Sequence, residues 1–402
     1  MAGGPGSYLM GDEERKEVLD VMESWYLFRY GSEGDPAFKE KCVLFEEEFA
    51  KKIGAPYCVA TSSGTGALLA SLAALGIGAD DEVIVPGYTF IASISSIMLS
   101  NAVPVLCEVD ESLTMDPADI EKRITPKTKA ILPVHMLGNP ADLDPILAIA
   151  KKHDLKVLED CCQACGATYN GKRVGTYGDI GAFSLNCFKT ISAGDGGAVI
   201  TKDEDLYERA FGFHDQGHKP NRTGVEVGNR SIVGMNMRMN ELTGAVALAQ
   251  ARKLDMILDT LRAKKARFKA ALEGGKGYTF RKINDEGECN TLLTIIMDTK
   301  ERAEAFTAKT GVKPMSTSGW HVYNNMEQIL NKKTAQAYPF GKDVHYAAHM
   351  LPQTDDILER AFNFSVGVVD PGIGAVMGIN VTYSDDAIDK KAAEIRKLLE
   401  EL

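Results

Sequence analysis

The residues with the clearest chemical meaning are an aspartate and a lysine near expected strand ends. Asp160 closes the apolar run Val157–Asp160, and Lys189 stands between the strand-like segment 181–184 and the glycine-rich return 194–197. A pyridoxal 5'-phosphate (PLP) enzyme needs such a pair, because the lysine forms a Schiff base with the cofactor aldehyde and the acid keeps the pyridine nitrogen protonated. The alternative for Lys189 alone is a solvated surface lysine, the commonest fate of that residue type.

A run of small residues, Thr61–Leu68, is suited to hold a phosphate group. It follows the short strand-like segment Tyr57–Ala60 and opens an apolar helix that extends to about Leu75. Such a helix start leaves backbone N–H groups available to an anion, and glycines allow close approach. An ordinary Ser/Thr helix cap is the alternative. The run is not a nucleotide-binding P-loop, because no lysine follows in the required place.

Two further segments place aromatic and polar side chains next to expected strand or helix ends. Phe90 follows the strand 82–86, at the carboxyl edge where parallel α/β sheets bind ligands, and is placed to stack on a flat ring. A core aromatic is the alternative. Asn236 and Arg238 precede a long expected helix, and a cap at Asn240 explains neither of them.

Together these segments resemble the DegT/DnrJ/StrS family of PLP-dependent sugar aminotransferases, which have the aspartate-aminotransferase fold (PLP fold type I). The resemblance extends from about Gly11 to the C-terminus. Its motifs occur in the family's order and spacing: Ser63–Thr65, Thr89–Phe90, Glu159–Asp160 with Gln163, Ser184 with Lys189 and Asp195–Gly197, and Asn236–Met239.

The resemblance implies roles for the cofactor-binding residues. Lys189 would carry the Schiff base and Asp160 would face the pyridinium nitrogen. Gln163 would contact the ring hydroxyl, and Phe90 would cover the ring. The phosphate would be held by Gly64, Thr65, Ser184 and, from the neighbouring subunit, Asn236. The last role implies a homodimer with a shared active site.

The substrate pocket departs from the family pattern in two places. Asp195 stands where the family usually has glutamate, and no aromatic follows Leu137 in the run after His135. The segments 25–31 and 215–218, with His135–Met136, are most similar to the subgroup that makes an 8-amino-3,8-dideoxy-octulosonate sugar. The carboxylate of such a sugar could meet Lys219 or Arg222.

Four residues are candidate substrate contacts. Arg238 could fork onto the carboxylate of the amino donor, or it could form a salt bridge that pins its loop. The candidate sugar contacts are His135, His218 and His321, for which a structural role is the alternative.

The predicted activity is transfer of an amino group from glutamate or glutamine to a keto or aldehyde sugar. The alternatives within the fold are a PLP-dependent sugar dehydratase, which carries histidine at the lysine position, and an amino-acid lyase. A non-catalytic regulatory or binding protein is an alternative of a different class, and Lys189 and Asp160 argue against it.

Composition indicates a cytoplasmic globular enzyme. The net charge of −11 argues against binding to nucleic acid or an anionic membrane. No signal peptide or apolar run of about 18 residues is seen. The cluster Cys161, Cys162 and Cys165 lacks a second ligand pair, so no metal is expected.

Alternating strands and helices predict an α/β fold with a mostly parallel sheet. We expect a large domain at 1–255 with an N-terminal helical arm, and a smaller α+β domain at 256–402.

Overall fold

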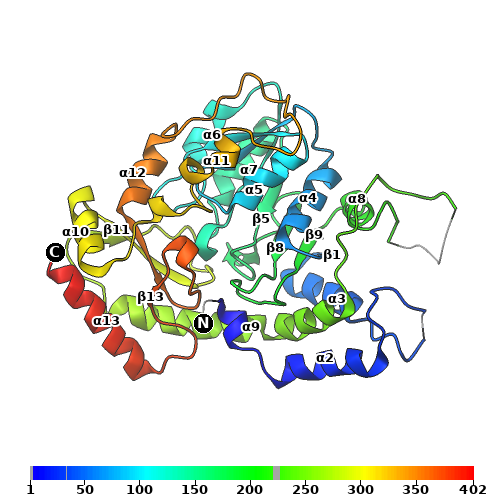
Figure 1. Ribbon diagram of the computed structural model, residues 1–402, viewed down its shortest axis with the longest axis horizontal. Helices are drawn as coiled ribbons and strands as arrows, with labels where there is room; N and C mark the ends of the chain where they lie inside the picture. The colour runs from blue at the N-terminus through cyan, green and yellow to red at the C-terminus, as the bar shows by residue number, and fades with distance from the viewer. Residues whose placement is uncertain (1–2, 33, 221–226) are drawn as a thin grey trace.

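The computed structural model describes residues 3–32, 34–220 and 227–402, which build two main sheets (Figure 1). The larger sheet has seven strands in the order β1-β9-β8-β5-β4-β2-β3. Strand β9 runs antiparallel to β1 and β8, and the other pairs are parallel. The strands are β1 (Tyr57–Thr61), β2 (Glu82–Pro86), β3 (Val103–Cys107), β4 (Thr128–Ile131), β5 (Lys156–Asp160), β8 (Ile180–Ser184) and β9 (Gly197–Thr201).

Both faces of this sheet are covered. In β2 all five residues are buried, and Val83 and Val85 belong to one core while Ile84 belongs to another. This alternation is expected of a strand that packs on both sides. The surrounding helices are α2 (Asp12–Ser24), α3 (Lys41–Ile53), α4 (Gly64–Leu75), α5 (Ile91–Leu99), α6 (Pro117–Arg123), α7 (Leu143–Lys152) and α8 (Glu204–His214).

The second sheet has the order β10-β11-β12-β13 and carries the C-terminal part of the chain. Helix α9 (Glu241–Ala270) passes from the seven-stranded sheet to this part, across the lower half of the molecule in Figure 1. The elements of the C-terminal part are β10 (Tyr278–Phe280), β11 (Leu292–Met297), β12 (Ala361–Ser365), β13 (Met377–Gly378), α10 (Lys300–Thr310), α11 (Glu327–Leu330), α12 (Pro352–Arg360) and α13 (Asp385–Glu400). Short elements elsewhere are α1 (Pro5–Tyr8), β6 (Thr168–Tyr169) and β7 (Lys172–Arg173).

The predicted fold class, a mostly parallel α/β sheet with a smaller C-terminal part, is confirmed. Asn240 caps α9 as expected, because its side chain accepts the N–H of Thr243. The division at 255/256 falls inside α9 and stays a prediction. Within the described residues, no helix combines the length and apolarity that a membrane crossing would need.

Two helices of the N-terminal part start after residues with non-helical backbone. Gly11 is the N-cap of α2, and its N–H donates to Glu14. Glu40 takes a left-handed conformation, and α3 begins at the next residue, Lys41.

Candidate active site

A cavity of about 490 Å³ lies where carboxyl ends of the large sheet meet the N-terminus of α4 and loops of the C-terminal part. This volume is typical of a small-molecule site. Eight of the twelve predicted site residues line it: Gly64, Thr65, Phe90, Asp160, Gln163, Ser184, Lys189 and His321. Four do not: His135, His218, Asn236 and Arg238.

Lys189 reaches the cavity from the turn that follows β8. Its backbone N–H closes the turn by donating to the carbonyl of Asn186 at 2.9 Å. Its Nζ lies 6.0 Å from the ring centroid of Phe90, and no carboxylate among the described residues forms an ion pair with it. The amine is therefore available to react with a carbonyl in the cavity.

Asp160 is held rigidly at the end of β5. Its Oδ2 accepts a hydrogen bond from Ser93 Oγ at 2.7 Å, and its Oδ1 accepts the N–H of Cys162 at 3.0 Å. Thr89 Oγ1 lies 2.6 Å from Ser93 Oγ, and it donates to Ser93 because the Ser93 proton is directed to Asp160. A buried acceptor fixed in this way is suited to face a cationic ring nitrogen.

The N-terminus of α4 provides an anion site. Ser63 Oγ accepts the N–H of Gly66 at 3.0 Å and caps the helix, which leaves N–H groups of the first turn toward the cavity. A Cβ at Gly64 would lie only 2.7 Å from the Cβ of Ser184, so this approach requires glycine. With the amine of Lys189 and the carboxylate of Asp160 in the same cavity, the residues fit PLP.

The side chain of Gln163 is oriented by an unusual turn. Its Oε1 accepts the N–H of Leu137 at 3.1 Å, which leaves its amide N–H groups to the cavity. Leu137 has φ = 56°, a left-handed conformation that costs energy outside glycine. Buried Arg281 donates to the carbonyls of Met136 at 3.3 Å and Leu137 at 3.0 Å and holds the turn. Glu288 accepts from the same guanidinium at 3.1 Å.

His135 has a structural role, which corrects its prediction as a sugar contact. Its Nδ1 accepts the N–H of Ala141 at 2.9 Å, so its Nε2 carries the proton and donates to Glu159 at 3.1 Å. Burial works to raise the pKa of Glu159, but hydrogen bonds from His135 and from Gly175 and Gly178 outweigh it and lower the pKa. The ring is fully buried and is not part of the cavity lining.

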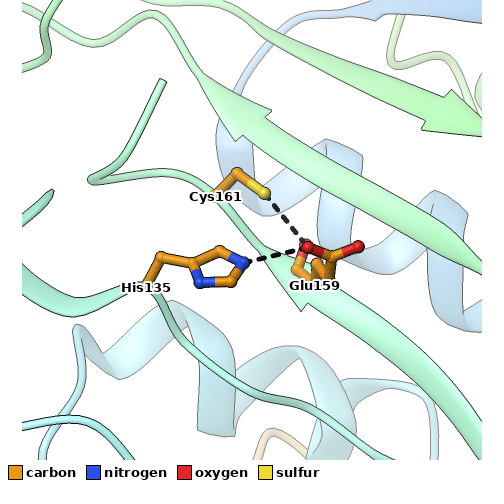
Figure 2. A group of neighbouring side chains, drawn as sticks. All are labelled: His135, Glu159 and Cys161. Atoms are coloured by element: carbon orange, nitrogen blue, oxygen red, sulfur yellow. Dashed lines mark hydrogen bonds and ion pairs between the residues drawn. The ribbon is translucent and has the colours of Figure 1, made fainter. Parts of the chain in front are cut away.

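Cys161 completes a cluster with His135 and Glu159 that has suitable atom types for a metal ion (Figure 2). The ligand atoms are already engaged, since both ring nitrogens of His135 and both oxygens of Glu159 take part in hydrogen bonds. Burial raises the pKa of the Cys161 thiol well above its usual value, and the thiol donates to the Glu159 carbonyl. The cluster stabilises the end of β5 through hydrogen bonds alone.

Arg238 is engaged outside the cavity. Its guanidinium forms an ion pair with Asp215, donates to Gln216 Oε1 at 3.1 Å and lies over the ring of Phe28. Within one chain the structure therefore corresponds to the salt-bridge alternative, and not to a contact with the amino donor. Asn236 is exposed, and its Oδ1 accepts the N–H of Arg238.

The loop with His218 also lies outside the cavity. His218 pairs through its backbone with Arg230, and Lys219 forms an ion pair with Glu208 at 3.0 Å. The within-chain structure thus does not bring His218 to the site. Arg222, the other candidate for a sugar carboxylate, lies outside the described residues.

His321 enters the cavity from the C-terminal part of the chain, beside Trp320. Burial, and then the positive charge of Lys189, lower the pKa of His321 to about 3, so the ring is neutral. Ser318 Oγ donates to the carbonyl of Gly372, so it accepts from His321 Nδ1 at 3.0 Å. The Nε2 atom of His321 is then an acceptor.

The lining residues that were not predicted as site residues include Ser93, Trp320 and Asp370. Ser93 lies one helical turn from Phe90, and this spacing could have indicated a role. Trp320 stacks on Phe90 with ring centroids 6.2 Å apart, and Asp370 accepts the N–H of Gly372 at 2.7 Å. Both come from the C-terminal part of the chain, and Trp320 is the neighbour of the predicted residue His321.

Fold and site define the class of PLP-dependent enzymes of fold type I. The chain belongs to the DegT/DnrJ/EryC1/StrS aminotransferase family, whose model matches residues 10–368. The family predicted from the sequence motifs is confirmed.

Known proteins similar to this chain include GDP-perosamine synthase of Caulobacter vibrioides, 41% identical over 60% of this chain and 62% of that protein. L-glutamine:2-deoxy-scyllo-inosose aminotransferase of Micromonospora echinospora is 41% identical over 56% of this chain and 54% of that protein. The chain thus spans less than two thirds of the length of these relatives. The crystal structure of 3-amino-5-hydroxybenzoic acid synthase is 26% identical, with a TM-score of 0.81 and full coverage of both chains.

Proposed function

We propose that the protein is a PLP-dependent aminotransferase that moves an amino group from glutamate or glutamine to the carbonyl of a keto or aldehyde sugar. The observation that carries the proposal is that one cavity holds the amine of Lys189, which has no ion-pair partner among the described residues, and Asp160, whose carboxyl group accepts two hydrogen bonds. Bound PLP supplies an aldehyde for the lysine and a ring that takes up an electron pair from the substrate carbon.

The residues of the chain divide the remaining work. The Nζ of Lys189 would accept a proton from the α-carbon of the amino donor and return it to the cofactor carbon that is bonded to the same nitrogen. Asp160 would face the ring nitrogen, and hydrogen bonds from Ser93 and Cys162 hold its carboxyl group in place. Gln163 and the N-terminus of α4 would bind the ring hydroxyl and the phosphate.

The cavity lining favours a sugar as the amino acceptor. Among the described residues, Lys189 is the one lysine or arginine in the lining, and it is engaged by the cofactor, whereas a dicarboxylic keto acid needs a further cation for its distal carboxylate. Neutral polar groups and aromatics dominate the lining: Thr65, Asn186, Thr190, Phe90 and Trp320. Two relatives are named for GDP-perosamine and for an aminated inosose, and the second is named with L-glutamine as donor. An eight-carbon keto-acid sugar remains a more specific candidate.

We include a homodimer in the proposal. Asn236 is exposed, and apolar side chains around it and along the N-terminal arm are exposed as well, including Phe28, Val233 and Met235. A second copy of the chain would cover these residues and bring Asn236 to a neighbouring phosphate site. Cytoplasmic location belongs to the same proposal, and the eight unpaired cysteines are consistent with a reducing compartment.

A competition assay tests the activity. PLP-loaded enzyme with glutamate or glutamine is offered sugar carbonyls together with oxaloacetate and pyruvate, and the aminated products are quantified by mass spectrometry. We expect a sugar to be aminated fastest. Faster amination of oxaloacetate or pyruvate than of any sugar would contradict the proposal that the amino acceptor is a sugar. Loss of a hydroxyl group from a sugar without amination would indicate a dehydratase, and no binding of PLP would indicate a non-catalytic protein.

A further inference from the structure

The N-terminal strap, residues Gly3–Ser7, lies directly on the loop that carries Lys189. The N–H of Gly4 donates to the carbonyl of Cys187 at 2.8 Å, and Ser7 Oγ donates to the same carbonyl at 2.7 Å. The segment precedes the part of the chain that matches the family model. Figure 1 shows this end of the chain beside α9.

The strap also contacts a second segment beside the cavity. Gly3 and Val369 exchange two backbone hydrogen bonds, of 3.0 and 2.9 Å. The neighbours of Val369, Val368 and Asp370, line the cavity. The strap therefore links the Lys189 loop of the large sheet to a cavity loop of the C-terminal part.

The glycines of the strap are not equivalent. A Cβ at Gly4 would lie 2.4 Å from the carbonyl oxygen of Lys189 and from the carbonyl carbon of Phe188. These are backbone atoms, so they could make room only if the lysine loop moved. A Cβ at Gly3 would meet its nearest atom, Ser7 Cβ, at an ordinary 3.4 Å. Gly4 has φ = −99°, which any residue adopts, so its requirement for glycine is steric.

We propose that the N-terminal strap positions the Lys189 loop against the cofactor, with Gly4 and Ser7 as positioning residues. The contacts place the strap on the peptide of the reactive lysine itself, so a displacement of Gly4 is passed to Lys189 without intervening side chains. The inference rests on the proposed function, because its readouts concern cofactor binding by Lys189.

Three glycine-to-alanine variants of the full chain separate positioning from a general effect on folding. Gly4→Ala creates the clash, Gly3→Ala adds the same methyl one residue earlier without one, and Gly78→Ala adds it in open space. Ser7→Ala removes only the hydroxyl donor and tests the same contact if Gly4→Ala folds poorly. The readouts are the thermal unfolding midpoint of the cofactor-free protein, the Kd for PLP, and the pH midpoint of the visible absorption of the bound cofactor.

We expect Gly4→Ala to weaken PLP binding by about tenfold or more and to move the pH midpoint, because small displacements of reactive groups have large effects. Ser7→Ala should change the Kd for PLP and the pH midpoint in the same direction but by less. Gly3→Ala and Gly78→Ala should match the wild type in both quantities. Wild-type values for both Gly4→Ala and Ser7→Ala, or equal losses in Gly3→Ala, would overturn the inference. If the wild-type protein itself bound no PLP, the proposed function would fail instead.

Discussion

Ser93 Oγ lies 2.7 Å from Asp160 Oδ2 and 2.6 Å from Thr89 Oγ1, so a helix that starts after β2 fixes the acid that ends β5. The relationship joins two strand ends of the large sheet at the cavity. It makes the orientation of the carboxylate depend on a hydroxyl from another element.

Replacing this hydroxyl should affect catalysis without unfolding the protein. Ser93→Ala removes one donor to a charged group and should lower kcat by roughly tenfold, and Asp160→Asn should lower it by about a hundredfold or more, since the charge is lost. Ser96→Ala is the matched control, because Ser96 lies one turn along α5 and donates to the carbonyl of Ser93. A Ser93→Ala enzyme as active as the Ser96→Ala enzyme would contradict this role.

The buried cluster of Arg281, Glu288 and Lys265 should matter for stability. Arg281→Leu leaves Glu288 with one cationic partner and removes the donors to the 136–137 turn, so the free energy of unfolding should fall by about 3–5 kcal/mol. Urea unfolding of the cofactor-free protein measures this change in the free energy of unfolding. Arg262→Leu, which breaks an exposed pair with Asp259, should leave the urea midpoint almost unchanged. Similar midpoints for both variants would disprove the claim.

His321 should make the protein sensitive to acid. Its pKa is about 3 in the folded protein and about 6.5 in an unfolded chain, so below pH 6.5 the unfolded chain takes up a proton that the folded protein does not. This contribution to stability is present above pH 6.5 and is lost as the pH falls toward 3. The loss of unfolding free energy between pH 7 and pH 5 should be smaller in His321→Gln than in wild type. Exposed His345→Gln is the control, and an equal loss in all three proteins would contradict the argument.

A shared active site predicts that two inactive variants complement each other. Lys189→Ala lacks the amine, and Asn236→Asp places a negative charge where a neighbour's phosphate would bind. In a hybrid dimer one site has both native residues, so an equal mixture should recover about a quarter of the wild-type activity after subunit exchange. No recovery, with exchange verified by native mass spectrometry, would mean that Asn236 does not act across an interface.

The sequence was most informative where chemistry and local structure coincide. Lys189, Asp160 and Gly64 stand beside strand or helix ends, and the order of the motifs indicates that one sheet edge collects them. His135 also follows a strand of the large sheet, but its ring donates a hydrogen bond to Glu159, because a buried carboxylate requires hydrogen-bond donors.

The remaining site residues depend on contacts between distant segments. Arg281 reaches the carbonyl of Leu137, and Gly4 reaches that of Cys187, through the packing of elements far apart in the chain. No periodicity or spacing specifies such contacts. The sequence left two roles open for Arg238, and its ion pair with Asp215 within the chain forms only once the loop is folded.

The most direct test of the account is to identify the lysine that binds the cofactor. PLP-loaded protein is reduced with borohydride, digested, and analysed by mass spectrometry, with Lys189→Ala treated in parallel. The account predicts one phosphopyridoxyl group per chain, located on Lys189 and absent from the variant. A stoichiometric label on another lysine, or a wild-type protein that takes up no label, would contradict it.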